Sequence, residues 1–284
     1  MNSGLNLSIP SYENNSDLIF YKVFSSNVKE NECEFEFVFL HDIGTYHRPY
    51  FKFMEELEKT YSGRSIYTFI DFYGHGNSGG ERCASISSKS YLRDIYEVLS
   101  ATKRDFSAKK TILIGHGFGG TICLLGAAEK TFTNVSGYLL INPILKFQLS
   151  TYLDKIIKKD IIIGNGFRVN SSINGLSRYS NIDLAVEHDS DPLNLNFFTR
   201  GFLKNVRKTA KEVRSKAYYI DQPLHFIVND HQQILDTSIV GLFSRGVSSK
   251  NIEVQKFKGT KQNFFLEDNR NKLLDELSLW IDNL

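Results

Sequence analysis

The chain has 284 residues, of which 41% are hydrophobic, so it can bury a full core as one large domain with an insertion. Its formal net charge of +2 argues against a strong general attraction to nucleic acid, and we expect no nucleic-acid partner. No apolar run approaches the roughly 20 residues of a membrane span. The first stretch, MNSGLNLSIPSYENN, lacks the basic and apolar parts of a signal peptide, so we expect a cytoplasmic protein.

The cysteines and histidines do not form a recognisable metal-binding pattern. The odd number and wide spacing of the cysteines fit neither a disulfide framework nor a metal site, and we expect three reduced thiols. These are Cys33, Cys83 and Cys123. No two histidines have the spacing of a zinc-binding HExxH motif, so we expect no metal and no cofactor.

Strand and helix patterns alternate along the first half of the chain. Strands are predicted over residues 18–23, 34–40, 65–72, 111–114 and 137–141. Helices are predicted over residues 48–60, 87–102 and 120–130. This alternation is typical of an α/β protein with a mostly parallel central sheet flanked by helices on both faces.

The alternation stops near residue 145 and resumes near residue 222. The intervening segment, 145–221, shows no convincing strand alternation and is predicted to be mostly helical. Further strands are predicted over 223–228 and 252–257, and further helices over 237–244 and 271–283. We therefore predict an α/β core made of residues 1–144 and 222–284, interrupted by an inserted segment over residues 145–221.

A glycine-rich turn joins the predicted strand 111–114 to the following helix. The turn reads Gly115-His116-Gly117-Phe118-Gly119, which has the strand–turn–helix context of the G-x-S-x-G nucleophile elbow with glycine at its centre. A plain glycine-rich turn and an anion-binding helix start are the alternatives. A phosphate-binding G-x-x-x-x-G-K-[ST] pattern is not present, and a dinucleotide fingerprint fits poorly.

Four segments of the chain carry further motifs: FVFLHDIGTYHRPYF, IDFYGHGNSGGERCASISSKSYLRDI, GHGFGG and LSRYSNIDLAVEHDSDPL. Together they resemble the monoacylglycerol lipase and lysophospholipase (serine aminopeptidase-like) branch of the α/β-hydrolase superfamily. The resemblance runs from about Leu18 to Trp280. It implies an α/β-hydrolase fold in which residues 145–221 form a helical cap, or lid, over the active site.

The resemblance also implies that the catalytic triad is substituted. The nucleophile position is Gly117, the acid position is Gln232 and the histidine position is Gln262. No histidine follows His231, and an amide cannot take up a proton near neutral pH, so a base is missing. We therefore expect no catalytic residues and a pseudoenzyme that binds a lipid, an acyl-bearing small molecule or a protein partner. The alternatives are an active ester hydrolase with a water activated by His231, and a structural protein with a collapsed pocket.

Four further residues belong to the expected pocket and oxyanion region: His41, Asp42, His116 and Phe118. The resemblance expects His-Gly where this chain has His41-Asp42. A carboxylate that points into the pocket would repel a developing negative charge and favour a neutral or cationic ligand. The alternative is that Asp42 turns out to solvent or caps a loop. Phe118 is a candidate for the wall of an acyl-binding pocket.

A basic helix is predicted from Arg200 to Lys216 in the cap. Its basic residues recur at helical spacing beside an apolar stripe, which is typical of an amphipathic helix with a solvated face. A second interpretation is weak contact with an anionic membrane or an acidic partner through this face.

Overall fold

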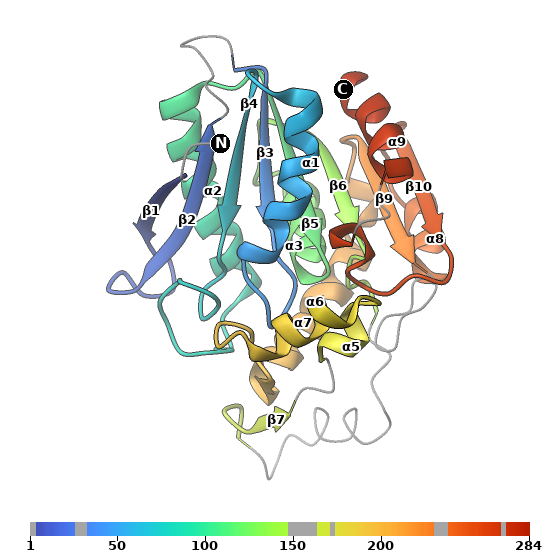
Figure 1. The fold of residues 1–284 in the computed structure, drawn as a ribbon. Helices are drawn as coiled ribbons and strands as arrows, with labels where there is room; N and C mark the ends of the chain where they lie inside the picture. Colours follow the sequence, from blue (N-terminus) through green and yellow to red (C-terminus); the bar gives the residue numbers. More distant parts are fainter. Residues whose placement is uncertain (1–3, 26–32, 147–163, 171–173, 230–237, 268–270) are drawn as a thin grey trace.

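The computed structural model describes residues 4–25, 33–146, 164–170, 174–229, 238–267 and 271–284. An eight-stranded sheet lies at its centre, in the order β1-β2-β4-β3-β5-β6-β9-β10 (Figure 1). The strands are β1 (Leu5–Pro10), β2 (Leu18–Ser25), β3 (Phe35–Leu40), β4 (Ser65–Ile70), β5 (Lys110–His116), β6 (Val135–Ile141), β9 (Leu224–Asn229) and β10 (Ile252–Phe257).

All sheet strands after β2 run parallel to one another. Strand β2 is antiparallel to both β1 and β4, whereas the pairs from β4 through β3, β5, β6 and β9 to β10 are parallel. The carboxyl ends of β3, β5, β6 and β9 therefore meet at one edge, where parallel sheets carry their sites. The predicted fold class, a mostly parallel α/β-hydrolase sheet flanked by helices, is confirmed.

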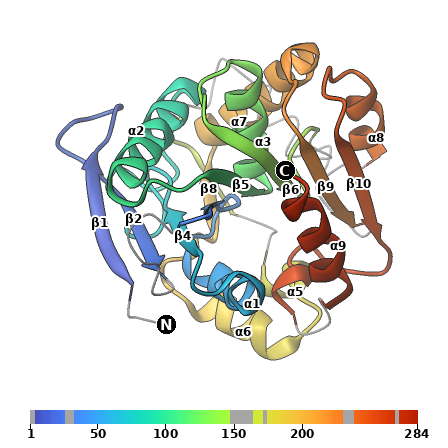
Figure 2. The same ribbon diagram turned by 90° about the horizontal axis from the view of Figure 1, so that it is seen from above.

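Helices cover both faces of the sheet. They are α1 (Phe51–Tyr61), α2 (Ser88–Phe106), α3 (Phe118–Ala128), α7 (Arg200–Ser215), α8 (Ser238–Arg245) and α9 (Asn271–Asp282). Helices α1 and α9 lie on one face, and α2, α3, α7 and α8 lie on the other (Figure 2). Short 3-10 helices η1 (Arg48–Tyr50), η2 (Ala217–Tyr219) and η3 (Phe264–Leu266) complete these layers.

The N-terminal strand β1 was not predicted. Its six residues pair with β2 from Leu5↔Val23 to Pro10↔Leu18, at the edge of the sheet. Most of its side chains are exposed or half-buried, so the strand lacks the run of apolar residues that marks the central strands. Backbone pairing with β2 holds this segment in place, together with the partly buried side chains of Leu7 and Ile9, which pack against the core.

Residues 145–221 were predicted to be mostly helical, and their described part contains two short strands as well as helices. Strands β7 (Arg168–Asn170) and β8 (Phe197–Thr199) form a small antiparallel sheet. Helices α5 (Gly175–Arg178) and α6 (Ile182–Ser190) lie beneath the carboxyl ends of the strands in Figure 1. We refer to β7, α5, α6 and β8 as the cap.

Helix α7 packs against α3, on the face of the sheet that α3 covers. Its apolar stripe joins the same core cluster as α2 and α3. The buried members of that stripe are Phe202, Leu203, Val206, Ala210 and Val213. Of the basic residues expected on its outer face, Arg200 is buried, and Arg214 donates to the backbone oxygens of Leu145 and Ala210. Membrane contact through this helix stays a prediction, and among the described residues no helix is long and apolar enough to cross a membrane.

Candidate functional site

The glycine-rich turn between β5 and α3 has the tight geometry of a nucleophile elbow. Gly117 lies at its centre with φ 53° and ψ −114°, a backbone conformation that favours glycine. A Cβ on Gly115 would lie 2.6 Å from the backbone of Gly120, and one on Gly119 would lie 2.1 Å from the oxygen of Leu40. Neighbouring backbone therefore requires glycine on both sides of the centre.

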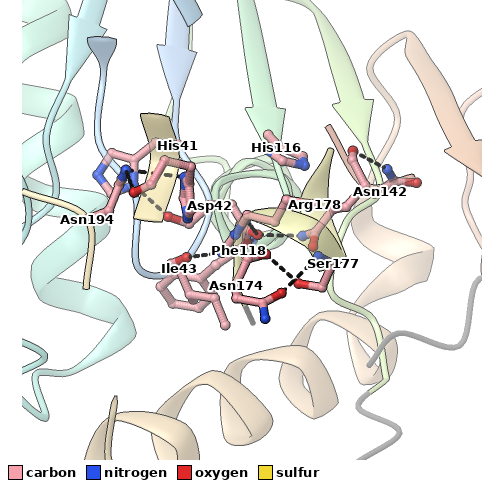
Figure 3. Close-up of polar contacts among 12 residues, drawn as sticks. His41, Asp42, Ile43, His116, Phe118, Asn142, Asn174, Ser177, Arg178 and Asn194 are labelled. Carbon is pink, nitrogen blue, oxygen red and sulfur yellow. Dashed lines mark hydrogen bonds and ion pairs between the residues drawn. The ribbon is translucent and has the colours of Figure 1, made fainter. Parts of the chain in front are cut away.

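The carboxylate of Asp42 fills the space above this elbow (Figure 3). Asp42 follows β3, is fully buried, and its Oδ1 accepts a hydrogen bond of 2.9 Å from the backbone N–H of Phe118. A Cβ added to Gly117 would lie 1.8 Å from that same Oδ1. Of the two orientations that the sequence left open, the side chain takes the inward one.

Arg178 of α5 pairs with Asp42 from the cap side. Its guanidinium donates to Oδ2 of Asp42 over 3.1 Å and to the backbone oxygen of Ile43 over 2.7 Å. The side chains of both partners are only 1% exposed. The cation that the inward carboxylate was expected to favour is thus supplied by the protein itself. Sequence reasoning missed Arg178, because its residue type alone gave no signal of this role.

Gln262 completes the set of donors around Asp42. Its Nε2 donates to Oδ2 of Asp42 over 2.6 Å, so the residue at the expected histidine position does reach the centre. Gln232, the expected acid position, and His231 lie outside the described residues. We refer to Asp42, Arg178, Gln262 and the Phe118 N–H as the central cluster.

These contacts keep the buried carboxylate ionised. Burial alone would raise the pKa of Asp42. The nearby Arg178 guanidinium and the Phe118 N–H lower the pKa by more than burial raises it, so it lies below its usual value. Three donors on two oxygens leave little unsatisfied hydrogen-bonding capacity. The carboxylate is therefore a well-solvated anion, with protein groups in place of water.

Two asparagines hold the loop that carries Gln262. Asn142, directly after β6, donates to the backbone oxygen of Gln262 over 3.1 Å and accepts from the N–H of Asn229 over 3.0 Å. Asn229, the last residue of β9, donates to the oxygen of Thr260 over 2.9 Å. The N–H of Asn263 binds the oxygen of Arg178 over 2.9 Å. The loop after β10 is thus fastened both to the sheet and to the cap.

The two histidines expected in the oxyanion region lie behind the centre. His41 contacts the backbone oxygen of Asp42 through Nδ1 and accepts from the N–H of Phe72 through Nε2. His116 lies 2.8 Å from the hydroxyl of Tyr50, which in turn accepts from the N–H of Asp42. Burial lowers the pKa of His116 to about 4, so it is neutral near pH 7. Both histidines orient backbone and side-chain groups around Asp42.

The ring of Phe118 does not line an acyl pocket. It is 1% exposed and packs in the core against the rings of Phe72, Tyr91 and Phe202. Only its backbone N–H reaches the central cluster. The expectation that Phe118 forms a pocket wall was therefore wrong.

The thiols and acidic groups offer no second chemical centre among the described residues. All three cysteines are buried and free, and burial raises the pKa of the Cys33 thiol to about 11. Across the part of the chain that the structure describes, no three His, Cys, Asp or Glu side chains gather to hold a metal ion. The central cluster is the candidate functional site.

An eight-stranded sheet with a glycine elbow after β5 and a cap over its carboxyl edge defines an α/β-hydrolase. The model of the serine aminopeptidase S33 family matches residues 34–269, so the chain belongs to that family.

Several named lipases are similar to this chain. A monoglyceride lipase homolog of Monkeypox virus is 25% identical over 236 residues, covering 81% of this chain and 84% of the viral protein. The monoglyceride lipase of Rattus norvegicus is 33% identical over 133 residues, covering 43% of this chain and 41% of the rat protein. A solved structure of a soluble Saccharomyces cerevisiae monoglyceride lipase with a substrate analog has a TM-score of 0.84 at 18% identity. That match covers 100% of this chain and 95% of the yeast chain, and it shows the fold alone.

Proposed function

We propose that this monoglyceride lipase-like protein does not hydrolyse esters and works by binding. The observation that carries the proposal is the position of Asp42. In this fold the N–H of the residue after the elbow centre stabilises the oxyanion of the reacting acyl group. Here that N–H, from Phe118, is already bound to the Asp42 carboxylate.

Two described residues of the site also lack the groups that acyl transfer needs. Gly117 carries no side-chain oxygen to attack a carbonyl carbon. Gln262 presents an amide to the centre, and an amide does not accept a proton near neutral pH. We propose that Gln232 likewise replaces the acid. A nucleophile, its base and the acid that orients the base act as a unit, so these changes together support loss of the reaction.

Burial of the central cluster supports the same proposal. A substrate carbonyl would have to displace Asp42 from Phe118 and separate it from Arg178. Breaking a buried ion pair by removing one partner costs about 3–5 kcal/mol, which is the order of resistance expected here. A developing oxyanion placed beside the displaced carboxylate would also be repelled.

An active ester hydrolase is the second candidate, since relatives of this chain are named lipases. The two are separated by assaying purified protein with monoacylglycerols and short-chain p-nitrophenyl esters. We expect hydrolysis no faster than the buffer blank and no labelling by a fluorophosphonate probe, which reacts with activated serines.

A matched variant identifies any residual activity. Asp42→Asn keeps the shape of the side chain but removes its charge, so an activity at this site should change with it, whereas a contaminant's activity should not. Steady turnover by the unaltered protein that Asp42→Asn or His231→Ala abolishes would refute the proposal.

A further inference from the structure

Strand β1 is the last strand at one end of the central sheet, so one of its two edges has no neighbouring strand among the described residues (dark blue in Figure 2). In an antiparallel pair, every second residue bonds to the partner strand, and the N–H and C=O groups of the residues between them point the other way. The bonds around β1 establish which of its residues point outward.

The even-numbered residues of β1 point outward. Just beyond the strand, the N–H of Ser11 donates to the backbone oxygen of Asp17 over 2.9 Å, and these two residues continue the register of the β1–β2 pair. Hydrogen-bonded pairs recur every two residues, so the odd-numbered residues of β1 bond to β2 as well. The outward groups therefore belong to Asn6, Ser8 and Pro10.

The residue opposite Ser8 gives independent evidence for this assignment. Phe20 pairs with Ser8 in the β1–β2 register. It directs its own backbone groups away from β1, because its N–H donates to the hydroxyl of Ser78 over 2.8 Å and its oxygen accepts from the N–H of Asp71 over 3.0 Å. The N–H and the oxygen of Ser8 are therefore left without a partner among the described residues.

The free edge of β1 lacks the features that usually keep an exposed strand from pairing. Such edges normally carry charged side chains, especially lysine, or a bulge. Strand β1 reads LNLSIP, with no charged residue, and its register with β2 is unbroken over all six residues. Pro10, which has no N–H, is the last residue of the strand and leaves its middle open.

The apolar side chains of β1 share one face of the sheet. By alternation, Leu5, Leu7 and Ile9 point to the side of α2. Leu7 and Ile9 are half-buried against the core cluster there, whereas Leu5 is 58% exposed. A groove of about 690 Å³ lies between the end of β1 and α2, with Ile9 and Leu92 in its lining. A strand added to this edge, with apolar residues on the same face, would cover Leu5.

We propose that β1 pairs with β1 of a second copy of this chain, in the antiparallel direction and about a twofold axis at Leu7. Asn6 then lies opposite Ser8 of the second copy, and each such pair exchanges two hydrogen bonds, so the two symmetric pairs make four. Leu5 lies opposite Ile9 of the second copy, and Leu7 lies opposite itself. Each apolar side chain meets another, and no charge is placed in the pairing.

The sequence of β1 matches itself in this register and not in the neighbouring ones. A shift by two residues in one direction places Asn6 opposite Pro10, which has no N–H to give to the Asn6 oxygen. A shift in the other direction places Ser8 opposite Gly4, whose φ of 66° is not extended. This self-complementarity favours a second copy as the partner. The inference goes beyond the proposed function and does not depend on it.

Sedimentation velocity on the full chain tests the proposal. Over about two decades of concentration, we expect a reversible shift from monomer to dimer. Ser8→Pro removes one outward N–H from each copy, which eliminates two of the four bonds, so the dimer should dissociate about tenfold more readily or more. Ser8→Ala is the matched control, because it keeps the N–H and should leave the dissociation constant unaltered. Circular dichroism checks that both variants fold.

A charge exchange tests the register and still decides the matter if Ser8→Pro fails to fold. One variant carries Asn6→Lys with Ser8→Lys, and the other carries Asn6→Glu with Ser8→Glu. Both positions are exposed, so the changes should be compatible with the fold. Like charges would lie opposite each other in either homodimer, so each variant alone should be monomeric. An equal mixture should form a heterodimer, and high salt should weaken it.

Four results would overturn the inference. They are a monomer at every concentration, equal dimerisation of Ser8→Pro and Ser8→Ala, undiminished homodimers of both charge variants, and a mixture of these variants that stays monomeric. A dimer that survives the changes in β1 would form through another surface.

Discussion

A serine at position 117 should destabilise the protein and not simply return an attacking group to it. The Cβ of any residue there would lie 1.8 Å from Oδ1 and 2.1 Å from Cγ of Asp42, far inside contact distance. The carboxylate must therefore leave the Phe118 N–H and shift away from Arg178 before Gly117→Ser can fold. We expect no ester hydrolysis from this variant alone.

The cost can be estimated from two parts. A side chain at φ 53° adds left-handed backbone strain of about 1–2 kcal/mol. Displacing one partner of a buried ion pair adds about 3–5 kcal/mol. Gly117→Ser should thus lower the free energy of unfolding by about 4–7 kcal/mol, enough to unfold much of a protein of ordinary stability.

A double-mutant cycle isolates the steric part. Asp42→Gly alone leaves Arg178 buried without its carboxylate and should cost about 3–5 kcal/mol. In the double variant Asp42→Gly with Gly117→Ser, the clash is gone and the cost of leaving Arg178 without its partner is counted once instead of twice. Its loss in the free energy of unfolding should therefore be smaller than the sum of the two single losses by about 3 kcal/mol or more.

Urea unfolding followed by circular dichroism measures each term. Gly63→Ser is the matched control. Gly63 also has a positive φ of 77°, but among the described residues a Cβ added there would meet no non-neighbouring atom within 4 Å. This variant therefore reports backbone strain without a clash. It should cost about 1–2 kcal/mol. If the two changes at positions 42 and 117 add within about 0.5 kcal/mol, the contact between them does not have the assigned role.

Three further predictions concern charge and pH. Arg178→Met should lower the free energy of unfolding by about 3–5 kcal/mol and speed proteolysis of the cap. Combining it with Asp42→Asn should recover part of that loss. Equal stability of Arg178→Met and the unaltered protein in urea would contradict this. Burial raises the pKa of Asp94 to about 6, so the native state prefers the protonated acid and loses that advantage as pH rises through 6. Asp94→Asn should therefore raise the thermal midpoint at pH 7.5 and leave it nearly unchanged at pH 4, and a gain at pH 4 alone would reverse the assignment. Burial lowers the pKa values of His75 and His116 to about 3 and about 4, so their contribution is present above pH 6.5 and is lost as pH falls toward 4. Measured by urea unfolding in the Asp94→Asn background, these two residues together should contribute up to about 2.7 kcal/mol per pH unit to the fall in the free energy of unfolding, and a flat profile between pH 6 and 4.5 would refute it.

The sequence predicted the structure well where a residue type fits only one local structure. Apolar runs identified the central strands, and the glycines at 115, 117 and 119 identified the tight turn because no other residue fits there. The exposed strand β1 lacked such a run, and the basic helix α7 looked like a lid because its buried stripe could cover either a cap or a sheet. An amphipathic pattern shows that a helix has a buried face, but not what that face covers.

The central cluster could be predicted only in part. Asp42, Gly117 and Gln262 stood out as departures from a known pattern, yet their shared role depends on Arg178, which lies 136 positions from its partner Asp42. An arginine in a cap gives no local sign that its charge will be buried. Side-chain direction and long-range pairing follow from the assembled fold and not from local pattern.

The contact between Gly117 and Asp42 also bears on how this lineage can change. If an ancestor used a serine at the elbow, the first replacement to occur determined which later ones were tolerated. With the carboxylate in place, a reversion at 117 meets Asp42, and a reversion at 42 strands Arg178. Each single step back passes through a less stable protein, so selection for folding stability alone would keep Gly117 and Asp42 together.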